Sequence, residues 1–359
     1  MKVSLILGTR PEIIKMTPVI RELLRHEIDF FVLHTGQHYS YNLDKVFFEQ
    51  FKLPEPKYNL RVGSGTHAEE TGRMLIGIER VLVDEEPDIV LVEGDTNSVL
   101  AGALAAVKLG VPVGHVEAGL RSYDREMPEE INRVVTDHIS DYLFAPTEKA
   151  KLNLLREGID ENKIYVTGNT IVDAVYQNLS LADRSTIFSR LGLDEDDYFL
   201  LTLHRQENVD KAERLRSIFK GLEAVMREFE IPIMYPAHPR TRKRLKEFNI
   251  NVPRGVKLIE PVDYLSFLKL ECNANLILTD SGGVQEEACV LRVPCVTLRD
   301  NTERPETVEV GANIIAGVEP ENILRSVRIM LNRERNWKNP FGDGKAGARI
   351  VNILINDLG

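Results

Sequence analysis

The chain has 359 residues, of which 43% are hydrophobic and 28% are charged, and its formal net charge is −10. This length predicts two domains, and the composition excludes a disordered, collagen-like or low-complexity chain. Nucleic-acid binding is not expected, because an acidic chain lacks the clustered Lys and Arg that hold a phosphate backbone. An anionic ligand therefore needs a few local cations and backbone N–H groups.

Cysteine usage and hydropathy exclude several further classes. The three cysteines, Cys272, Cys289 and Cys295, form no CxxC pair, so neither a disulfide framework nor a zinc site is expected. The apolar run near Met1 is short for a signal peptide, and no stretch approaches the roughly eighteen apolar residues of a membrane span. We expect a cytoplasmic protein that binds no metal and no membrane.

The first half of the chain alternates strands with helices. Strands are predicted at 3–8, 29–34, 88–92, 111–116, 141–145 and 163–166, and helices at 11–26 and 97–109. A strand, a crossover helix and a second strand in this order pair in parallel with a right-handed turn. We expect a doubly wound, Rossmann-like domain over residues 1–168.

The same pattern restarts in the second half. Strands are predicted at 198–203, 231–235, 275–280 and 294–298, and helices at 210–229 and 283–291. The predicted fold is therefore α/β, with a second Rossmann-like domain over 169–344 and a last segment, 345–359, whose helix packs back on the first domain. The two domains are expected to face a central cleft, because open α/β sheets bind ligands beyond the carboxyl ends of their strands.

The first candidate site is the turn Gly8-Thr9-Arg10-Pro11-Glu12, with Lys15 one turn further on. N–H groups at a helix start carry partial positive charge, and Arg10 and Lys15 add two full charges, which suits an anion. An ordinary strand–helix turn with solvated cations is the alternative. The turn lacks the GxGxxG glycines, which argues against an NAD enzyme.

Carboxylates follow two of the predicted strands and begin one helix. Asp95 comes after strand 88–92, Glu117 comes after strand 111–116, and Glu129 and Glu130 follow Pro128. Neighbouring carboxylates raise the pKa of one member, which suits proton transfer. The alternatives are a helix cap for Asp95 and complementation of the helix dipole for one of the two adjacent glutamates.

The second half carries a histidine and a glycine turn at strand ends. His204, in HRQEN, is either a proton shuttle or phosphate partner, or a structural histidine with satisfied hydrogen bonds. In TDSGGVQEE (279–287), Ser281 and two glycines form either an anion cradle at a helix start or a simple N-cap. Glu287 suits two ribose hydroxyls, and Arg304 adds a cation on the same edge.

These motifs together resemble the non-hydrolysing UDP-N-acetylglucosamine 2-epimerases. The matching segments are GTRPEIIKM (8–16), VEGDTNSVLAG (92–102), HVEAGLRS (115–122), MPEEINR (127–133), HRQEN (204–208), TDSGGVQEE (279–287) and TERPE (302–306). The resemblance implies a glycosyltransferase type B (GT-B) fold and interconversion of UDP-N-acetylglucosamine and UDP-N-acetylmannosamine. It also implies a homodimer that needs neither NAD nor a metal ion, and so has no cofactor.

The resemblance also implies roles for individual residues. Asp95, Glu117, Glu129 and His204 would be catalytic. The UDP-sugar would be bound by Arg10, Lys15, Asp95, Glu117, His204, Phe267, Ser281, Gly282, Gly283, Glu287 and Arg304. A second, regulatory molecule of UDP-N-acetylglucosamine would lie against Gln37, His38, Arg205 and His238.

The implied reaction agrees with these residue types. Elimination of UDP from carbon 1 while a carboxylate removes the carbon 2 proton gives 2-acetamidoglucal, and UDP then adds back. The product would supply surface polysaccharide or glycan synthesis. A GT-B glycosyltransferase, a hydrolysing epimerase, an epimerase of a modified UDP-sugar and a non-catalytic nucleotide-sugar sensor remain alternatives.

Overall fold

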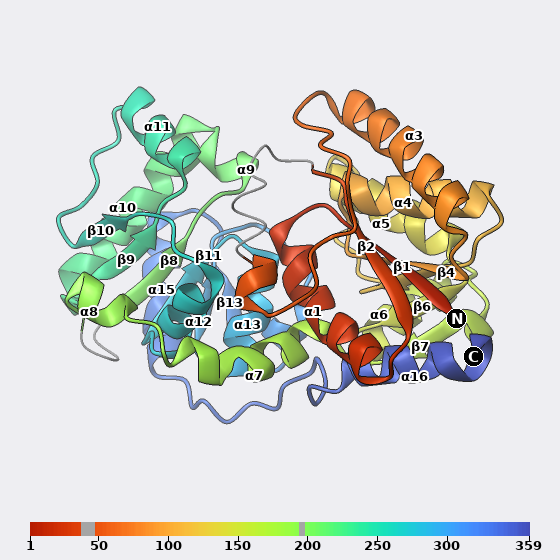
Figure 1. Ribbon diagram of the computed structural model, residues 1–359. Coiled ribbons are helices and arrows are strands. Elements are labelled where there is room, and N and C mark those ends of the chain that lie inside the picture. Colours follow the sequence, from red (N-terminus) through yellow and green to blue (C-terminus); the bar gives the residue numbers. More distant parts are fainter. Residues whose placement is uncertain (37–46, 194–197) are drawn as a thin grey trace. The chain divides into compact units, whose positions relative to one another are not determined.

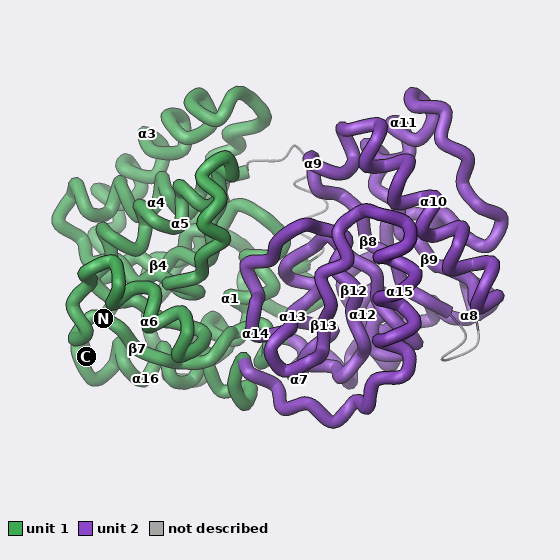
Figure 2. The backbone as a smooth tube through the Cα atoms, turned by 180° about the vertical axis from the view of Figure 1, so that it is seen from behind, with its two compact units in different colours: residues 1–174, 341–359 green, residues 175–340 purple. Residues whose placement is uncertain are grey.

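The computed structural model describes residues 1–36, 47–193 and 198–359, and the chain divides into two compact units. Unit 1 comprises Met1–Ala174 and Phe341–Gly359, and unit 2 comprises Val175–Pro340. Figure 2 shows the C-terminal segment returning to the unit in which the chain begins. The chain thus passes from unit 1 into unit 2 after Ala174 and returns to unit 1 at Phe341. Each unit has a sheet of its own.

Unit 1 contains a parallel sheet in the order β3-β2-β1-β4-β5-β6-β7 (Figure 1). Its strands are β1 (Lys2–Leu7), β2 (Asp29–His34), β3 (Tyr58–Asn59), β4 (Ile89–Glu93), β5 (Val113–Val116), β6 (Tyr142–Ala145) and β7 (Ile164–Val166). The strand order reverses between β1 and β4, which is where this fold class binds ligands.

Helices cover the sheet of unit 1. They are α1 (Arg10–Arg25), α3 (His67–Glu85), α4 (Asn97–Lys108), α5 (Pro128–Ile139), α6 (Glu148–Arg156), the first residues of α7 (Thr170–Ala182) and α16 (Ala346–Leu358), with a short 3-10 helix at Glu161–Lys163. Helix α4 packs between α3 and α5, and α16 packs on α1. A Cβ on Gly347 would lie 2.9 Å from the backbone carbon of Pro18, so only glycine allows α16 to approach α1 so closely.

Unit 2 repeats the architecture with a parallel sheet in the order β10-β9-β8-β11-β12-β13. Its strands are β8 (Phe199–Thr202), β9 (Ile233–Pro236), β10 (Val256–Ile259), β11 (Leu276–Thr279), β12 (Cys295–Thr297) and β13 (Asn313–Ile315). Its helices are α8 (Ile187–Leu191), α9 (Gln206–Val209), α10 (Ala212–Phe229), α11 (Pro239–Glu247), α12 (Tyr264–Cys272), α13 (Gly282–Leu291), α14 (Pro305–Glu309) and α15 (Pro320–Leu331). Here the order reverses between β8 and β11.

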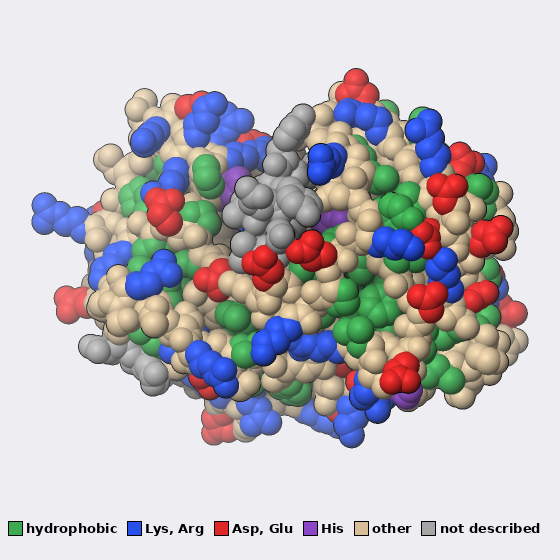
Figure 3. Space-filling model, in the orientation of Figure 1, with side chains coloured by type: hydrophobic (Ala, Val, Ile, Leu, Met, Phe, Trp, Pro, Cys, Tyr) green, Lys and Arg blue, Asp and Glu red, His purple; other side chains and the backbone are tan. Residues whose placement is uncertain are grey.

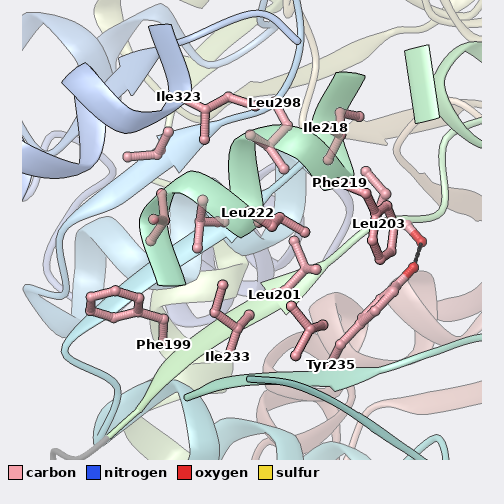
Figure 4. Packing of buried hydrophobic residues seen from close by; sticks show 14 of the residues in the cluster. Phe199, Leu201, Leu203, Ile218, Phe219, Leu222, Ile233, Tyr235, Leu298 and Ile323 are labelled. Carbon is pink, nitrogen blue, oxygen red and sulfur yellow. Dashed lines mark hydrogen bonds between the residues drawn. The ribbon is translucent and has the colours of Figure 1, made fainter. Parts of the chain in front are cut away.

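The core of unit 2 shows why its strands are continuous apolar runs. Leu201 of β8 and Ile233 of β9 pack against Ile218 and Leu222 of α10 (Figure 4). Tyr235 is also fully buried and donates its hydroxyl hydrogen to the carbonyl of Leu203 at 2.7 Å. Helices cover both faces of such a parallel sheet, so alternating polar positions are not needed.

The predicted α/β fold class is confirmed by two parallel sheets covered by helices. The strand predicted at 29–34 coincides with β2, and the other predicted strands differ from those observed by one or two residues at their ends. Strands β10 and β13 lie where the pattern predicts none, because they are short edge strands with partly exposed side chains. Their pairing with β9 and β12 defines them as strands.

Both signs of charge occur on the face of the protein drawn in Figure 3, where acidic and basic side chains lie over the whole view. Among the helices of the described residues, none is long and apolar enough to cross a lipid bilayer.

Candidate active site

The turns that follow β1 and β4 meet at the point where the strand order of unit 1 reverses. These two strands pair in parallel, so their carboxyl ends lie at the same sheet edge. A Cβ on Gly8 would lie 1.9 Å from the hydroxyl oxygen of Ser98 in α4, and this close approach requires glycine. The turn that is predicted to bind an anion (8–12) and the loop that carries Asp95 are therefore held side by side.

Glu12 ties these two turns together from a buried position in α1. Its carboxylate accepts hydrogen bonds from the amide of Gly8, the amide of Thr9 at 3.1 Å and the hydroxyl of Thr96 at 2.5 Å. Burial raises the pKa of Glu12 to about 7, and these hydrogen bonds offset only part of that effect. Glu12 stands in the quoted motif, but the sequence analysis assigned it no role.

Glu117 lies directly beyond β5 and forms an ion pair with Lys15 of α1. The Lys15 ammonium also lies 3.3 Å from Oε1 of Glu93, the last residue of β4, and the amide nitrogen of Asn169 lies 3.3 Å from Oε2 of Glu117. Glu117 has a φ of +69°, a conformation that non-glycine residues adopt at a cost of about 1–3 kcal/mol and that clusters at functional sites. Lys15, which is predicted to bind the UDP-sugar, therefore forms an ion pair with Glu117, which is predicted to be catalytic.

Asp95 is partly exposed and forms an ion pair with Arg133 of α5. The same guanidinium contacts Glu130 at 2.7 Å, and the buried Glu130 carboxylate accepts hydrogen bonds from the amides of Ser122 and Tyr123. The structure therefore assigns the two adjacent glutamates different places. Glu130 is a buried structural acid, whereas the predicted catalytic residue Glu129 is only partly buried in the first turn of α5.

A buried histidine lies beneath both carboxylate loops. His115 of β5 is within hydrogen-bonding distance of Asp137 Oδ1 (2.7 Å) and of the Gly94 carbonyl (2.8 Å). Asp137 also accepts the amide of Gly119 at 3.1 Å and pairs with Arg121 at 2.7 Å. Burial works to raise the pKa of Asp137, but His115 and Arg121 outweigh it and keep that pKa below its usual value.

The corresponding point of unit 2, between β8 and β11, is organised by Asp280. Its carboxylate accepts the amides of His204 and Arg205 at 3.0–3.1 Å and the side-chain amide of Asn208 at 3.2 Å. The His204 side chain is 53% exposed, and its Nε2 lies 3.8 Å from Asp280 Oδ1. Partial removal from water lowers the pKa of His204, and the cation of Arg205 acts in the same direction. The carboxylate of Asp280 opposes this shift.

The glycine turn after β11 is open on its outer side. Ser281 is the N-cap of α13, and its hydroxyl oxygen lies 3.5 Å from the amide of Val284. A Cβ on Gly282 would have its nearest neighbour at 3.6 Å, on Glu303 Oε2, and one on Gly283 would have its nearest at 3.9 Å. The packing therefore leaves room beside both glycines, and anion binding at this helix start stays a prediction.

Buried ion pairs underlie this turn. Arg299 contacts Glu303 at 2.7 Å, and Arg205 lies 3.8 Å from the same carboxylate. Arg304, predicted at the uridine end, forms a buried pair with Glu286 at 2.6 Å. Each of these guanidinium groups is thus held by a buried carboxylate.

Glu287 lies further along α13, on the buried side. The residue is 7% exposed, and its charge acts on Tyr264 and Glu271, both in α12. Burial raises the pKa of Glu271, and the neighbouring Glu287 adds to this effect. Phe267, on the same helix, packs partly buried against a hydrophobic cluster of unit 2.

The remaining predicted site residues are Arg10, His238, Gln37 and His38. The Arg10 guanidinium lies 5.6 Å from the centre of the Phe47 ring, and His238 is an exposed N-cap that accepts the amide of Arg240. Gln37 and His38 lie outside the described residues. Besides Glu12, the sequence analysis missed three site residues: Glu93, Arg133 and Asn169. The first two stand within quoted motifs, but Lys15, which contacts Glu93, and Asp95, which pairs with Arg133, are distant in the sequence.

Metal binding has no evident centre in the part of the chain that the structure describes. Within residues 1–36, 47–193 and 198–359, no three His, Cys, Asp or Glu side chains are grouped as a metal site requires. That the protein needs no cofactor remains a prediction.

Comparison with known proteins identifies the family. Residues 21–355 match the family model described as UDP-N-acetylglucosamine 2-epimerase. A Methanocaldococcus jannaschii protein of that name is 64% identical over 362 residues, covering 99% of each chain. A Pseudomonas aeruginosa protein named UDP-2,3-diacetamido-2,3-dideoxy-D-glucuronate 2-epimerase is 44% identical over 359 residues, also covering 99% of each.

A solved structure agrees with the sequence comparisons. The crystal structure of the M. jannaschii UDP-GlcNAc 2-epimerase in complex with UDP-GlcNAc and UDP matches with a TM-score of 0.94 and 64% identity, over 99% of this chain and 100% of that one. The family match and the named relatives thus define an α/β protein of the isomerase class. The chain belongs to the non-hydrolysing UDP-N-acetylglucosamine 2-epimerase family, so the resemblance predicted from the motifs is confirmed.

Proposed function

We propose that this enzyme interconverts UDP-N-acetylglucosamine and UDP-N-acetylmannosamine by inverting carbon 2. The observation that carries the proposal is the pair of carboxylates, Asp95 and Glu117, held by cations beyond the ends of adjacent strands. Two such groups in different environments are suited to opposite roles in proton transfer. The 64% identical relative bears the name of this activity.

The proposed reaction begins with an elimination. One carboxylate removes the proton from carbon 2, the bond between carbon 1 and the phosphate oxygen breaks, and that electron pair leaves with UDP. A double bond between carbons 1 and 2 gives 2-acetamidoglucal. A proton then reaches carbon 2 from the opposite face while a UDP oxygen attacks carbon 1. Asp95, Glu117 and Glu129 are the proposed acids and bases.

Unit 2 supplies the groups proposed to hold the leaving UDP. The N–H groups at the start of α13 and the hydroxyl of Ser281 suit the diphosphate, and His204 suits a phosphate oxygen. Glu287 is proposed to accept the ribose hydroxyls, and Phe267 and Arg304 are proposed at the uridine end. Arg10 and Lys15 are also proposed to contact the UDP-sugar, and Lys15 is in addition ion-paired with Glu117.

The wider predictions also belong to this proposal. We propose a cytoplasmic homodimer whose product supplies surface polysaccharide or glycan synthesis. A second molecule of UDP-N-acetylglucosamine is proposed to regulate the enzyme through Arg205 and His238, together with Gln37 and His38.

A sugar modified at carbon 3 or carbon 6 is the second candidate substrate. It is favoured by the 44% identity to the P. aeruginosa protein, whose name specifies a diacetamido glucuronate. The higher identity to the M. jannaschii protein places UDP-N-acetylglucosamine first.

The test is incubation of the purified protein with UDP-N-acetylglucosamine alone in heavy water, followed by proton NMR. We expect UDP-N-acetylmannosamine with deuterium at carbon 2, and traces of UDP and 2-acetamidoglucal after long incubation. Free N-acetylmannosamine would indicate a hydrolysing enzyme. No turnover without an acceptor would indicate a transferase or a sensor. Preferential turnover of a carbon 3- or carbon 6-modified sugar in the same assay would favour the second candidate.

A further inference from the structure

Three charged groups of unit 1 share a buried position beneath the proposed reaction centre. Lys15 is 8% exposed, Glu93 2% and Glu117 7%. The Lys15 ammonium pairs with Glu117 and lies 3.3 Å from Glu93 Oε1, so one cation bridges two carboxylates. The groups come from α1, β4 and the turn after β5, and the parallel pairing of β4 with β5 brings the two acids together.

The chemistry of this group differs from that of a simple ion pair. Two carboxylates repel one another in a medium from which water is largely excluded, and the ammonium stabilises each less than it would stabilise one alone. Burial raises the pKa of Glu93 well above its usual value, Lys15 opposes that effect, and Glu117 and Glu12 reinforce it. Protonation of either acid therefore strengthens the hold of Lys15 on the other.

We propose that Glu93 is a positioning residue which, by sharing Lys15 with Glu117, sets how readily Glu117 takes up and returns the proton of carbon 2. This inference rests on the proposed function of Glu117. Glu93 touches no substrate in this scheme. It acts through the shared ammonium and by competing with Glu117 for one proton, while the side-chain amide of Asn169 contacts Oε2 of Glu117 at 3.3 Å.

The groups that face the two acids define the expected effects. Glu117 faces Lys15 and Glu93, and Glu93 faces Lys15, Glu117 and Glu12. Glu93→Gln removes one of the two coupled carboxyls and leaves the ammonium to Glu117, so the tightest of the pair's two proton-binding steps is lost. Lys15→Met removes the cation that stabilises both carboxylates, so the pair holds its protons more tightly. When turnover is plotted against pH, the rise or fall (limb) that reports the ionisation of Glu117 must move in opposite directions in the two variants.

The experiment measures turnover against pH for the wild type and both variants. We expect the limb to move by about one pH unit or more, downward in Glu93→Gln and upward in Lys15→Met. Glu85→Gln is the matched control, because Glu85 is another ion-paired acid of unit 1, held by Lys2 at 2.8 Å and Lys57 at 2.7 Å. Lys2 begins β1, so this pair lies at the opposite end of the sheet, and the control profile must not move.

A second readout separates this inference from the proposed function. Glutamate labelled with carbon-13 at the side-chain carboxyl allows the titration of Glu117 to be followed by NMR without turnover, its signal being identified by its loss in Glu117→Gln. If the wild type shows no epimerisation, the proposed function is wrong. The shift of the Glu117 titration between the wild type and Glu93→Gln then decides by itself whether Glu93 positions Glu117. A folded Glu93→Gln protein with an unmoved Glu117 titration overturns the inference.

Discussion

His115 Nε2 lies 2.8 Å from the carbonyl oxygen of Gly94, so a side chain of β5 holds the loop that follows β4. A carbonyl only accepts, so Nε2 is the donor, and the other ring nitrogen faces Asp137 at 2.7 Å. Asp137 in turn accepts the amide of Gly119. One buried pair therefore positions the loops of both Asp95 and Glu117.

The first prediction follows from this pair. Asp137→Asn puts an amide NH2 group in place of an oxygen that accepts from His115, or from Arg121 and Gly119, so the loops shift. We expect kcat to fall about 100-fold, with UDP affinity unchanged, because a displacement of about 1 Å costs that much. The free energy of unfolding should fall by about 3–5 kcal/mol. Calorimetric titration with UDP and urea unfolding measure these effects.

The control for this variant is His138→Gln, since His138 is exposed on the same helix. Its turnover and stability should match those of the wild type. Normal turnover in a folded Asp137→Asn protein would contradict the positioning role.

The second prediction concerns the three proposed acids. Asp95→Asn, Glu117→Gln and Glu129→Gln should each lower kcat by about two to four decades, the usual contribution of one acid–base group. UDP affinity should change little, because the groups proposed to hold the leaving UDP lie in unit 2. Glu126→Gln is the control for Glu129, being an exposed acid just before α5. The assignment fails if all three variants turn over at near-normal rates.

The third prediction concerns the glycine turn before α13. Gly282→Val should weaken UDP binding, because the side chain fills the space the diphosphate needs, while the protein still folds, since a Cβ there has its nearest neighbour at 3.6 Å. Gly72→Val is the matched control, because a Cβ at that position in α3 meets no atom within 4 Å. Calorimetry that finds equal UDP affinities in the two variants would count against the cradle.

The fourth prediction concerns stability against pH. The folded-state pKa of Glu12, about 7, exceeds its ordinary value of 4.5, so the folded state binds the proton more tightly. Its contribution is therefore most favourable below about pH 4.5 and is lost as the pH rises through about 7. The wild type should lose about 3 kcal/mol more than Glu12→Gln between pH 4.5 and pH 8, measured by urea unfolding.

Glu69 provides the control for Glu12. Each glutamate occupies the third position of a helix and accepts the amide of its N-cap threonine, but Glu69 is exposed. That hydrogen bond lowers the pKa of Glu69, so the stability that Glu69 contributes is present at neutral pH and is lost as the pH falls. This pH dependence is opposite in sign to that of Glu12. A pH dependence of the same sign for both residues would show that burial is not the cause for Glu12.

Particular strands show which parts of the fold could be predicted from the sequence. Strand β2 was predictable to the residue, because DFFVLH is an apolar run bounded by polar residues. Strand β13 was not, because its three residues form a strand only by pairing with β12. The motifs likewise predicted Asp95 and Glu117, since functional carboxylates follow strand ends in this fold class.

The sequence by itself determined the fold class, the family and the acids beyond β4 and β5, because hydrophobic periodicity and local motifs are properties of neighbouring residues. Only the tertiary structure decided which cation each acid meets. Lys15 reaches Glu117 across 102 residues, and Arg133 reaches Asp95 across 38. Such pairs depend on the order of strands in the sheet and the packing of α1 and α5 beside it, which local sequence does not encode.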